Sequence, residues 1–163
     1  INPGPPDESK SYIGTAETLN TEVLKYTNNQ SHTFSITVLD EYGNAIENAT
    51  VTINTVTINL DYTDSNFEFT LSDGTASKTI TDADYNSSST EDQDVAVNLQ
   101  LTDANTDANG KVDVEITAED GYYDPTVGFD DVTLAVIRVS VDGGITHAGI
   151  DLRNEGYKYL WVN

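Results

Sequence analysis

The chain has 163 residues, with 28 Asp or Glu against 7 Lys or Arg, and its formal net charge at pH 7 is -21. A surface this acidic repels nucleic acid and anionic lipid, so we expect neither as a partner. The absence of cysteine excludes disulfides and thiolate metal sites. Because no apolar run approaches the roughly 20 residues that cross a bilayer, we expect no insertion into a membrane.

The surplus of carboxylates has three explanations. It suits a protein that works in high salt, acidic loops that are neutralised by bound calcium, or a soluble extracellular surface that resists aggregation. Three Asn-x-Ser/Thr glycosylation motifs, at Asn29, Asn48 and Asn86, agree with a secreted setting. The start at Ile1 without an initiator methionine fits removal of a signal segment or a truncation. We therefore expect an extracellular protein of the cell surface.

The first thirty residues differ from the rest. The opening INPGPPDESKS is rich in residues that disfavour regular structure, so residues 1–11 are expected to form an extended arm. Residues 12–26 fit one short amphipathic helix, while the Thr-rich TEVLKYT, residues 21–27, could equally be an edge strand. We expect residues 1–30 to be an N-terminal arm or exchanged segment, followed by one sandwich domain over residues 31–163.

From residue 34 onward, apolar and polar residues alternate with the period of half-buried strands. The alternation covers residues 34–39, 51–53, 67–71, 95–101 and 112–116. Between these segments stand turn sequences, namely Tyr42-Gly43-Asn44, Ser72-Asp73-Gly74, Asn109-Gly110 and Asp142-Gly143-Gly144. Many short alternating strands joined by such turns predict an all-β, antiparallel sandwich.

Two late segments break the simple alternation. Residues 132–141 are apolar on both faces, so this strand is either covered on both sides or carries a bulge that switches phase. The ending YKYLWVN predicts an extra C-terminal strand, with Tyr157, Tyr159 and Trp161 on one face. This aromatic stripe is either a core or interface stripe or a platform on which sugars stack.

Two segments resemble bacterial immunoglobulin-like repeats of the invasin and intimin type. They are FSITVLDEYGNAIENATVTI, residues 34–53, and TDANGKVDVEITAEDGYY, residues 106–123, each expected to form a hairpin. Collagen-adhesin stalk domains and transthyretin-like domains use similar hairpins. The resemblance implies an immunoglobulin-like topology with an N-terminal extension and a C-terminal extra strand. Residues 56–101 are long for a minimal repeat, so we expect an additional hairpin there.

The loop TDANTDANGKVD, residues 102–113, has oxygen ligands at alternate positions, as calcium-binding loops do. It predicts a calcium site, although a solvated hairpin loop has the same composition. The candidate ligands are Asp103, Asn105, Asp107, Asn109 and Asp113.

No motif of a nucleophile elbow, a phosphate-binding glycine loop or a zinc protease is present, so we expect no enzyme. A free sheet edge is a template for an added strand. With an arm at one end and a β-prone tail at the other, we expect a self-associating subunit of a surface filament or pilus-like fibre. The alternative is an immunoglobulin-like module of a cell-surface adhesin that binds a cell-surface ligand, with calcium or carbohydrate as further candidates.

Overall fold

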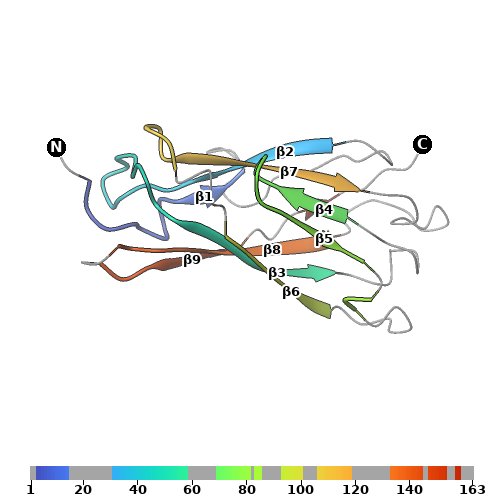
Figure 1. The fold of residues 1–163 in the computed structure, drawn as a ribbon. Coiled ribbons are helices and arrows are strands. Elements are labelled where there is room, and N and C mark those ends of the chain that lie inside the picture. The colour runs from blue at the N-terminus through green and yellow to red at the C-terminus, as the bar shows by residue number, and fades with distance from the viewer. Residues whose placement is uncertain are drawn as a thin grey trace.

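The computed structural model describes residues 3–14, 31–58, 69–81, 83–85, 93–100, 106–118, 133–144, 147–153 and 157–158. These residues form two antiparallel sheets packed face to face, a β-sandwich (Figure 1). The described part of the chain contains strands and turns but no helix. The predicted all-β, antiparallel sandwich is therefore confirmed.

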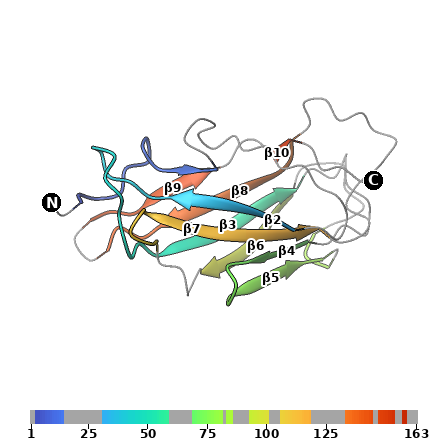
Figure 2. The ribbon, with the colours of Figure 1, turned by 90° about the horizontal axis from the view of Figure 1, so that it is seen from above.

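The strands of both sheets pair antiparallel with their neighbours. The first sheet has the order β1 (Tyr12–Ile13), β2 (Ser31–Thr37), β7 (Lys111–Ala118), β4 (Phe69–Ser72), β5 (Ser77–Ile80). The second has the order β10 (Tyr157–Lys158), β8 (Thr133–Val141), β3 (Val51–Ile58), β6 (Gln93–Gln100), and β9 (Ile150–Arg153) also pairs with β8. Figure 2 looks down through the first sheet onto the second.

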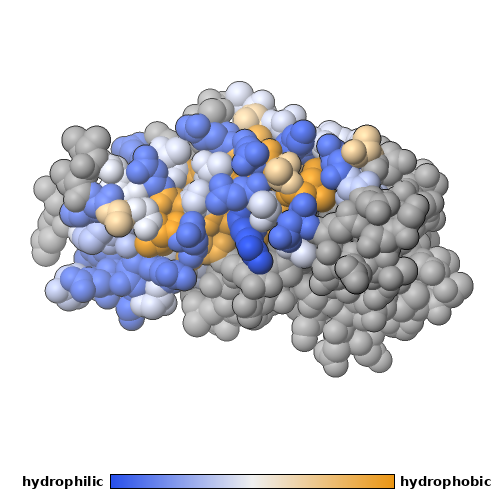
Figure 3. Space-filling view, turned by 90° about the horizontal axis from the view of Figure 1, so that it is seen from below, coloured by the Kyte–Doolittle hydropathy of each residue, from blue (hydrophilic) through white to orange (hydrophobic). Residues whose placement is uncertain are grey.

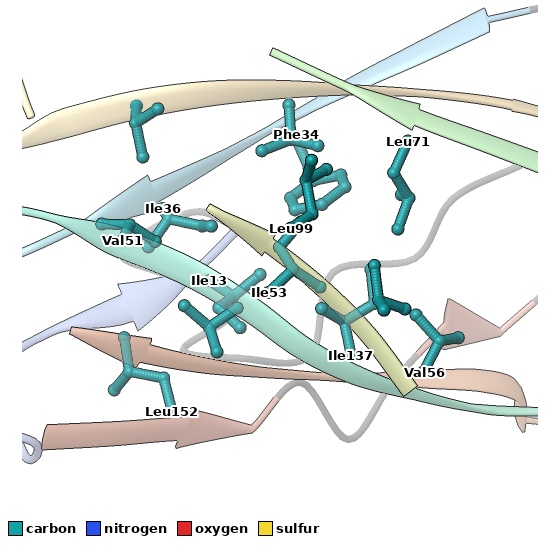
Figure 4. Close-up of a cluster of buried hydrophobic side chains, with 14 of the residues drawn as sticks. Ile13, Phe34, Ile36, Val51, Ile53, Val56, Leu71, Leu99, Ile137 and Leu152 are labelled. Atoms are coloured by element: carbon teal, nitrogen blue, oxygen red, sulfur yellow. The ribbon is translucent and has the colours of Figure 1, made fainter. Parts of the chain in front are cut away.

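The core lies between the two sheets and follows the alternation of the sequence. Phe34, Ile36 and Leu71 reach into it from the first sheet, and Ile53 and Ile137 from the second (Figure 4). All five are at most 1% exposed. Burial of each such side chain contributes about 1.5–3 kcal/mol relative to leaving it in water, so this layer is the main source of stability.

The two segments expected to be hairpins contain tight turns, and the longer strands before and after each turn lie in different sheets. The turns themselves form, with backbone bonds from Asp40 N–H to Asn44 O (2.9 Å) and from Gly110 N–H to Asp107 O (2.9 Å). However, β2 and β3 belong to different sheets, and so do β6 and β7. Across the first turn, Leu39 and Ala45 form an antiparallel bridge, so the first hairpin forms at its tip before β2 and β3 separate into the two sheets. Residues 101–105 and 119–132 lie outside the described residues, so the second hairpin stays a prediction. The additional hairpin expected within residues 56–101 is β4–β5.

The two corners lock together through Thr106, which is 1% exposed. Its hydroxyl donates to Ile46 O at 2.5 Å and accepts the Ala49 N–H at 2.9 Å. The backbone N–H of Val38 donates to Gly110 O at 2.8 Å. These bonds satisfy buried polar groups and fasten the two sheets to each other at one end of the sandwich.

Strand β3 is bulged at Asn54. Ile53 and Thr55 face Val139 and Arg138, which are consecutive in β8, so Asn54 is an extra residue opposite that strand. The extra residue switches the phase of burial, because Val51 and Ile53 are buried before it and Val56 after it. Among the described side chains of residues 132–141, Ile137, Val139 and Val141 are buried while Arg138 is exposed.

Candidate functional site

The N-terminal segment docks along the edge of β2 and is the first candidate site. Its strand β1 pairs Tyr12 with Thr37 and Ile13 with Ile36. Ile13 is 0% exposed and belongs to the core cluster (Figure 4). The segment thus fills a position between the sheets with one apolar side chain and a two-residue strand.

Polar contacts hold the rest of this segment to the residues that follow β2. The backbone N–H of Asp7 donates to Leu39 O at 2.9 Å. The Ser11 hydroxyl donates to Leu39 O at 3.2 Å and accepts the Leu39 N–H at 3.0 Å. The Gly14 N–H donates to Ser35 O at 2.8 Å. Residues 7–14 are therefore hydrogen-bonded at both of their ends, to Leu39 through Asp7 and Ser11 and to Ser35 through Gly14.

Asp40, a carboxylate that is 1% exposed, is the most strongly bonded acid of this site. Its Oδ1 accepts the backbone N–H groups of Tyr42 (2.9 Å) and Asn44 (2.8 Å). Its Oδ2 accepts the Gly4 N–H (3.1 Å) and Nδ2 of Asn44 (3.0 Å). Burial alone would raise the pKa of Asp40, but these hydrogen bonds outweigh it and lower the pKa from 3.8 to about 2.

The expected division of the chain is only partly within the described residues. Tyr12 and Ile13 form the short strand β1, so the helix considered for residues 12–26 does not include its first two residues. Residues 15–30 lie outside the described residues, so the helix alternative and the boundary at residue 30 stay predictions.

A second candidate site is a groove on the outer face of the second sheet, beside the N-terminal segment. We call it the Arg138 groove; it has a volume of about 510 Å³ and is lined by Glu8, Asn54, Thr55, Arg138, Val139, Asp151 and Leu152. Figure 3 shows the molecule from below, towards the second sheet, where hydrophilic side chains project over the face and hydrophobic residues are visible between them. Sequence analysis missed this groove, because its residues come from four separate segments and only strand register brings them together.

A third candidate is an acidic groove of about 310 Å³ on the first sheet, lined by Thr33, Ser72, Asp73, Gly74, Asp113 and Glu115. Oδ1 of Asp73 accepts the backbone N–H groups of Thr75 (2.9 Å) and Ala76 (2.6 Å), which closes the β4–β5 turn. Oδ2 of Asp73 is buried and has no hydrogen-bond partner among the described residues.

The residues predicted to bind calcium divide between two places. Oδ1 of Asp107 accepts the backbone N–H groups of Asn109 (2.8 Å) and Lys111 (3.0 Å), so Asp107 caps its own turn. Asp113 lies on β7, accepts the Ser35 hydroxyl at 2.6 Å and lines the acidic groove. Asp103 and Asn105 lie outside the described residues. Within those that are described, no three His, Asp or Glu side chains are grouped to hold a metal ion, and the calcium site of the whole loop stays a prediction.

The glycosylation and carbohydrate predictions are only partly within the described residues. Asn48 is exposed, with φ of 62°, in the corner that leads into β3. Its side chain is therefore open to solvent, as a glycan acceptor must be. Tyr157 lies on β10, opposite Ala135. The remaining predicted positions, Asn29, Asn86, Tyr159 and Trp161, lie outside the described residues.

No protein-family model matches this chain, and no curated protein or solved structure is significantly similar to it. Within the described ranges, no helix is both long and apolar enough to cross a membrane. Function must therefore be argued from the sandwich, its edges and its grooves.

Proposed function

We propose that this chain is a non-catalytic, extracellular structural protein, a subunit of a surface filament or pilus-like fibre whose copies are joined by strand complementation. The observation that carries the proposal is the way the N-terminal segment joins the sandwich. β1 adds only two residues to the edge of β2, yet its Ile13 is fully buried in the core. A short strand that supplies a core side chain is an element that copies of a chain can exchange.

The length of chain between β1 and β2 supports exchange. Residues 14–30, 17 in all, separate the two strands. Fully extended they reach about 60 Å, whereas the seven residues of β2 span about 23 Å. The segment is long enough to reach β2 of a neighbouring copy as well as its own. A head-to-tail exchange leaves every copy with one donor strand and one acceptor edge, and it produces an open polymer when the rotation between copies does not close into a ring.

The second candidate function is an immunoglobulin-like module of a cell-surface adhesin. It is favoured by the pairing of β1 with β2 of the same chain, because a copy closed in this way needs no neighbour. Both candidates use the same fold. In the filament, β1 pairs with β2 of a neighbouring copy, whereas in the adhesin module it pairs with β2 of its own chain.

Cysteine cross-linking distinguishes the two, because the natural chain has no cysteine. Tyr12 and Thr37 are Cα partners across β1 and β2, a separation that a disulfide can span. Chains with only Tyr12→Cys are mixed with chains with only Thr37→Cys and oxidised, and cross-linked peptides are identified by mass spectrometry. Strand exchange predicts an intermolecular link between positions 12 and 37.

The matched control mixes Tyr12→Cys with Lys78→Cys, which lies on β5 at the opposite edge of the same sheet. This mixture should give no specific link. In a chain that carries both Tyr12→Cys and Thr37→Cys, filament subunits should form covalent ladders. A product that is entirely monomeric, with an internal disulfide at every concentration, would contradict the filament proposal and favour the adhesin module.

A further inference from the structure

The Arg138 groove holds a cation that no described residue neutralises in an ion pair. The guanidinium of Arg138 is exposed, and it has no ion pair within the described part of the chain, although Glu8 and Asp151 line the same groove. In a chain with 28 acidic residues and 7 basic ones, an arginine without a carboxylate partner is unexpected. The guanidinium presents several donors in a fixed planar fork that matches a carboxylate.

One residue of the groove lining, Thr55, has an unsatisfied hydroxyl. Oγ1 of Thr55 is buried and has no hydrogen-bond partner among the described residues, and Thr55 is the Cα partner of Arg138 across β3 and β8. A buried polar atom without a partner costs free energy unless a ligand or water satisfies it. Next to it, the bulge at Asn54 directs a carboxamide into the groove lining, where its Oδ1 accepts the Ser140 hydroxyl at 3.2 Å. Bulges of this kind are frequent beside binding sites.

We propose that the Arg138 groove binds a hexuronate, a sugar acid that carries a single carboxylate. Arg138 would hold the sugar carboxylate in a charge-assisted hydrogen bond. The groove also has neutral groups and two carboxylates, Glu8 and Asp151. These carboxylates would repel a ligand with more than one carboxylate, but they would accept hydrogen bonds from sugar hydroxyls. The mixed lining therefore favours a ligand that carries one carboxylate and several hydroxyls. The site does not depend on the filament proposal, because one chain forms the whole groove.

The test titrates glucuronate, with glucose as the uncharged control, into the full chain and follows the backbone amides by NMR at several salt concentrations. We expect saturable shifts at residues 54, 55, 138 and 151 with glucuronate, with a dissociation constant on the order of 1 mM. Arg138→Gln should weaken binding at least tenfold. The matched control Lys111→Gln removes one charge from β7 of the other sheet and should leave binding unchanged.

Thr55→Val tests the same groove without any change of charge, so its effect does not come from altered electrostatics of the whole surface. It should retain the thermal stability of the natural chain and lose glucuronate affinity, a combination that a purely structural threonine would not give. Equal shifts with glucose, or equal loss in Lys111→Gln, would overturn the proposal. So would self-association that depends on Arg138 but does not respond to glucuronate, since the carboxylate would then come from a second copy.

Discussion

The backbone N–H of Gly4 donates to Oδ2 of Asp40 at 3.1 Å, across 36 positions of the sequence. The same carboxylate organises the turn of residues 40–44 through its other bonds. One acid therefore connects the start of the N-terminal segment to the corner between the two sheets. Any event that displaces this segment must also break a bond to Asp40.

Replacement of Asp40 by Asn should lower the melting temperature at pH 7. Asn retains one acceptor oxygen but turns the other into an NH2 group that faces the donors of Gly4 and Asn44. The matched control is Asp142→Asn, since Asp142 is exposed and, among the described residues, its side chain accepts only the Gly144 N–H, at 2.9 Å. Calorimetry of both variants checks the expectation, and an equal effect of the two would contradict it.

The stabilisation from Asp40 should depend on pH in a defined direction. Its pKa in the fold is about 2, below the ordinary value of 3.8, so folding favours the ionised form. The contribution is complete above the unfolded pKa and is lost as the pH falls through about 2. The difference in melting temperature between the natural chain and Asp40→Asn should therefore shrink between pH 4 and pH 2. A difference that stays constant over this range would show that ionisation of Asp40 is not its cause.

Ile13→Ala should destabilise the sandwich by about 2–4 kcal/mol, because it removes a fully buried side chain and leaves a cavity. Tyr12→Ala, at the half-exposed neighbour in the same strand, should cost less. Urea unfolding of both variants gives the free energies. If the N-terminal segment is the exchanged strand, Ile13→Ala should also reduce the amount of polymer at a given concentration.

Thr55→Val should leave the free energy of unfolding unchanged or raise it by up to about 1 kcal/mol, since it removes a buried hydroxyl that has no partner among the described residues. Thr57→Val is the matched control on the same strand. The Thr57 hydroxyl donates to Asp94 Oδ1 on β6, so its loss should cost about 0.5–1.5 kcal/mol. Urea unfolding of the two variants compares them, and a larger loss for Thr55→Val than for Thr57→Val would contradict the assignment.

Much of the sandwich could be predicted from alternation, because one buried face imposes a period of two on each strand. Phe34 and Ile36 show this directly, as do Val112 and Val114. Strand β9, with the sequence IDLR, was not predicted, since four residues are too few to establish a period, and β5, with the sequence SKTI, was covered only by the additional hairpin expected within residues 56–101. Sheet membership was also beyond the sequence, because local turn chemistry does not say which strands pair.

The Arg138 groove could not be predicted for a related reason. In the sequence, Arg138 is only an interruption of an apolar stretch. Its relation to Thr55 depends on the bulge at Asn54, which shifts register by one residue, and its relation to Glu8 depends on where the N-terminal segment docks. The register across the bulge and the docking of the N-terminal segment are features of the tertiary structure, and no local sequence pattern encodes them.

Gly110→Ala tests the lock between the two corners. A Cβ on Gly110 would lie 2.5 Å from the Val38 carbonyl oxygen, and the residue has φ of 72°. The backbone at Val38 can move away only at a large cost in free energy, so we expect a loss of at least about 2–3 kcal/mol in the free energy of unfolding.

Gly43→Ala is the matched control, because Gly43 has a similar φ of 81° but no atom within 4 Å of an added Cβ. It should cost only the conformational part, about 1 kcal/mol. Equal losses in the two variants would mean that Gly110 matters for its backbone angle alone, and that the corners are not held in close contact.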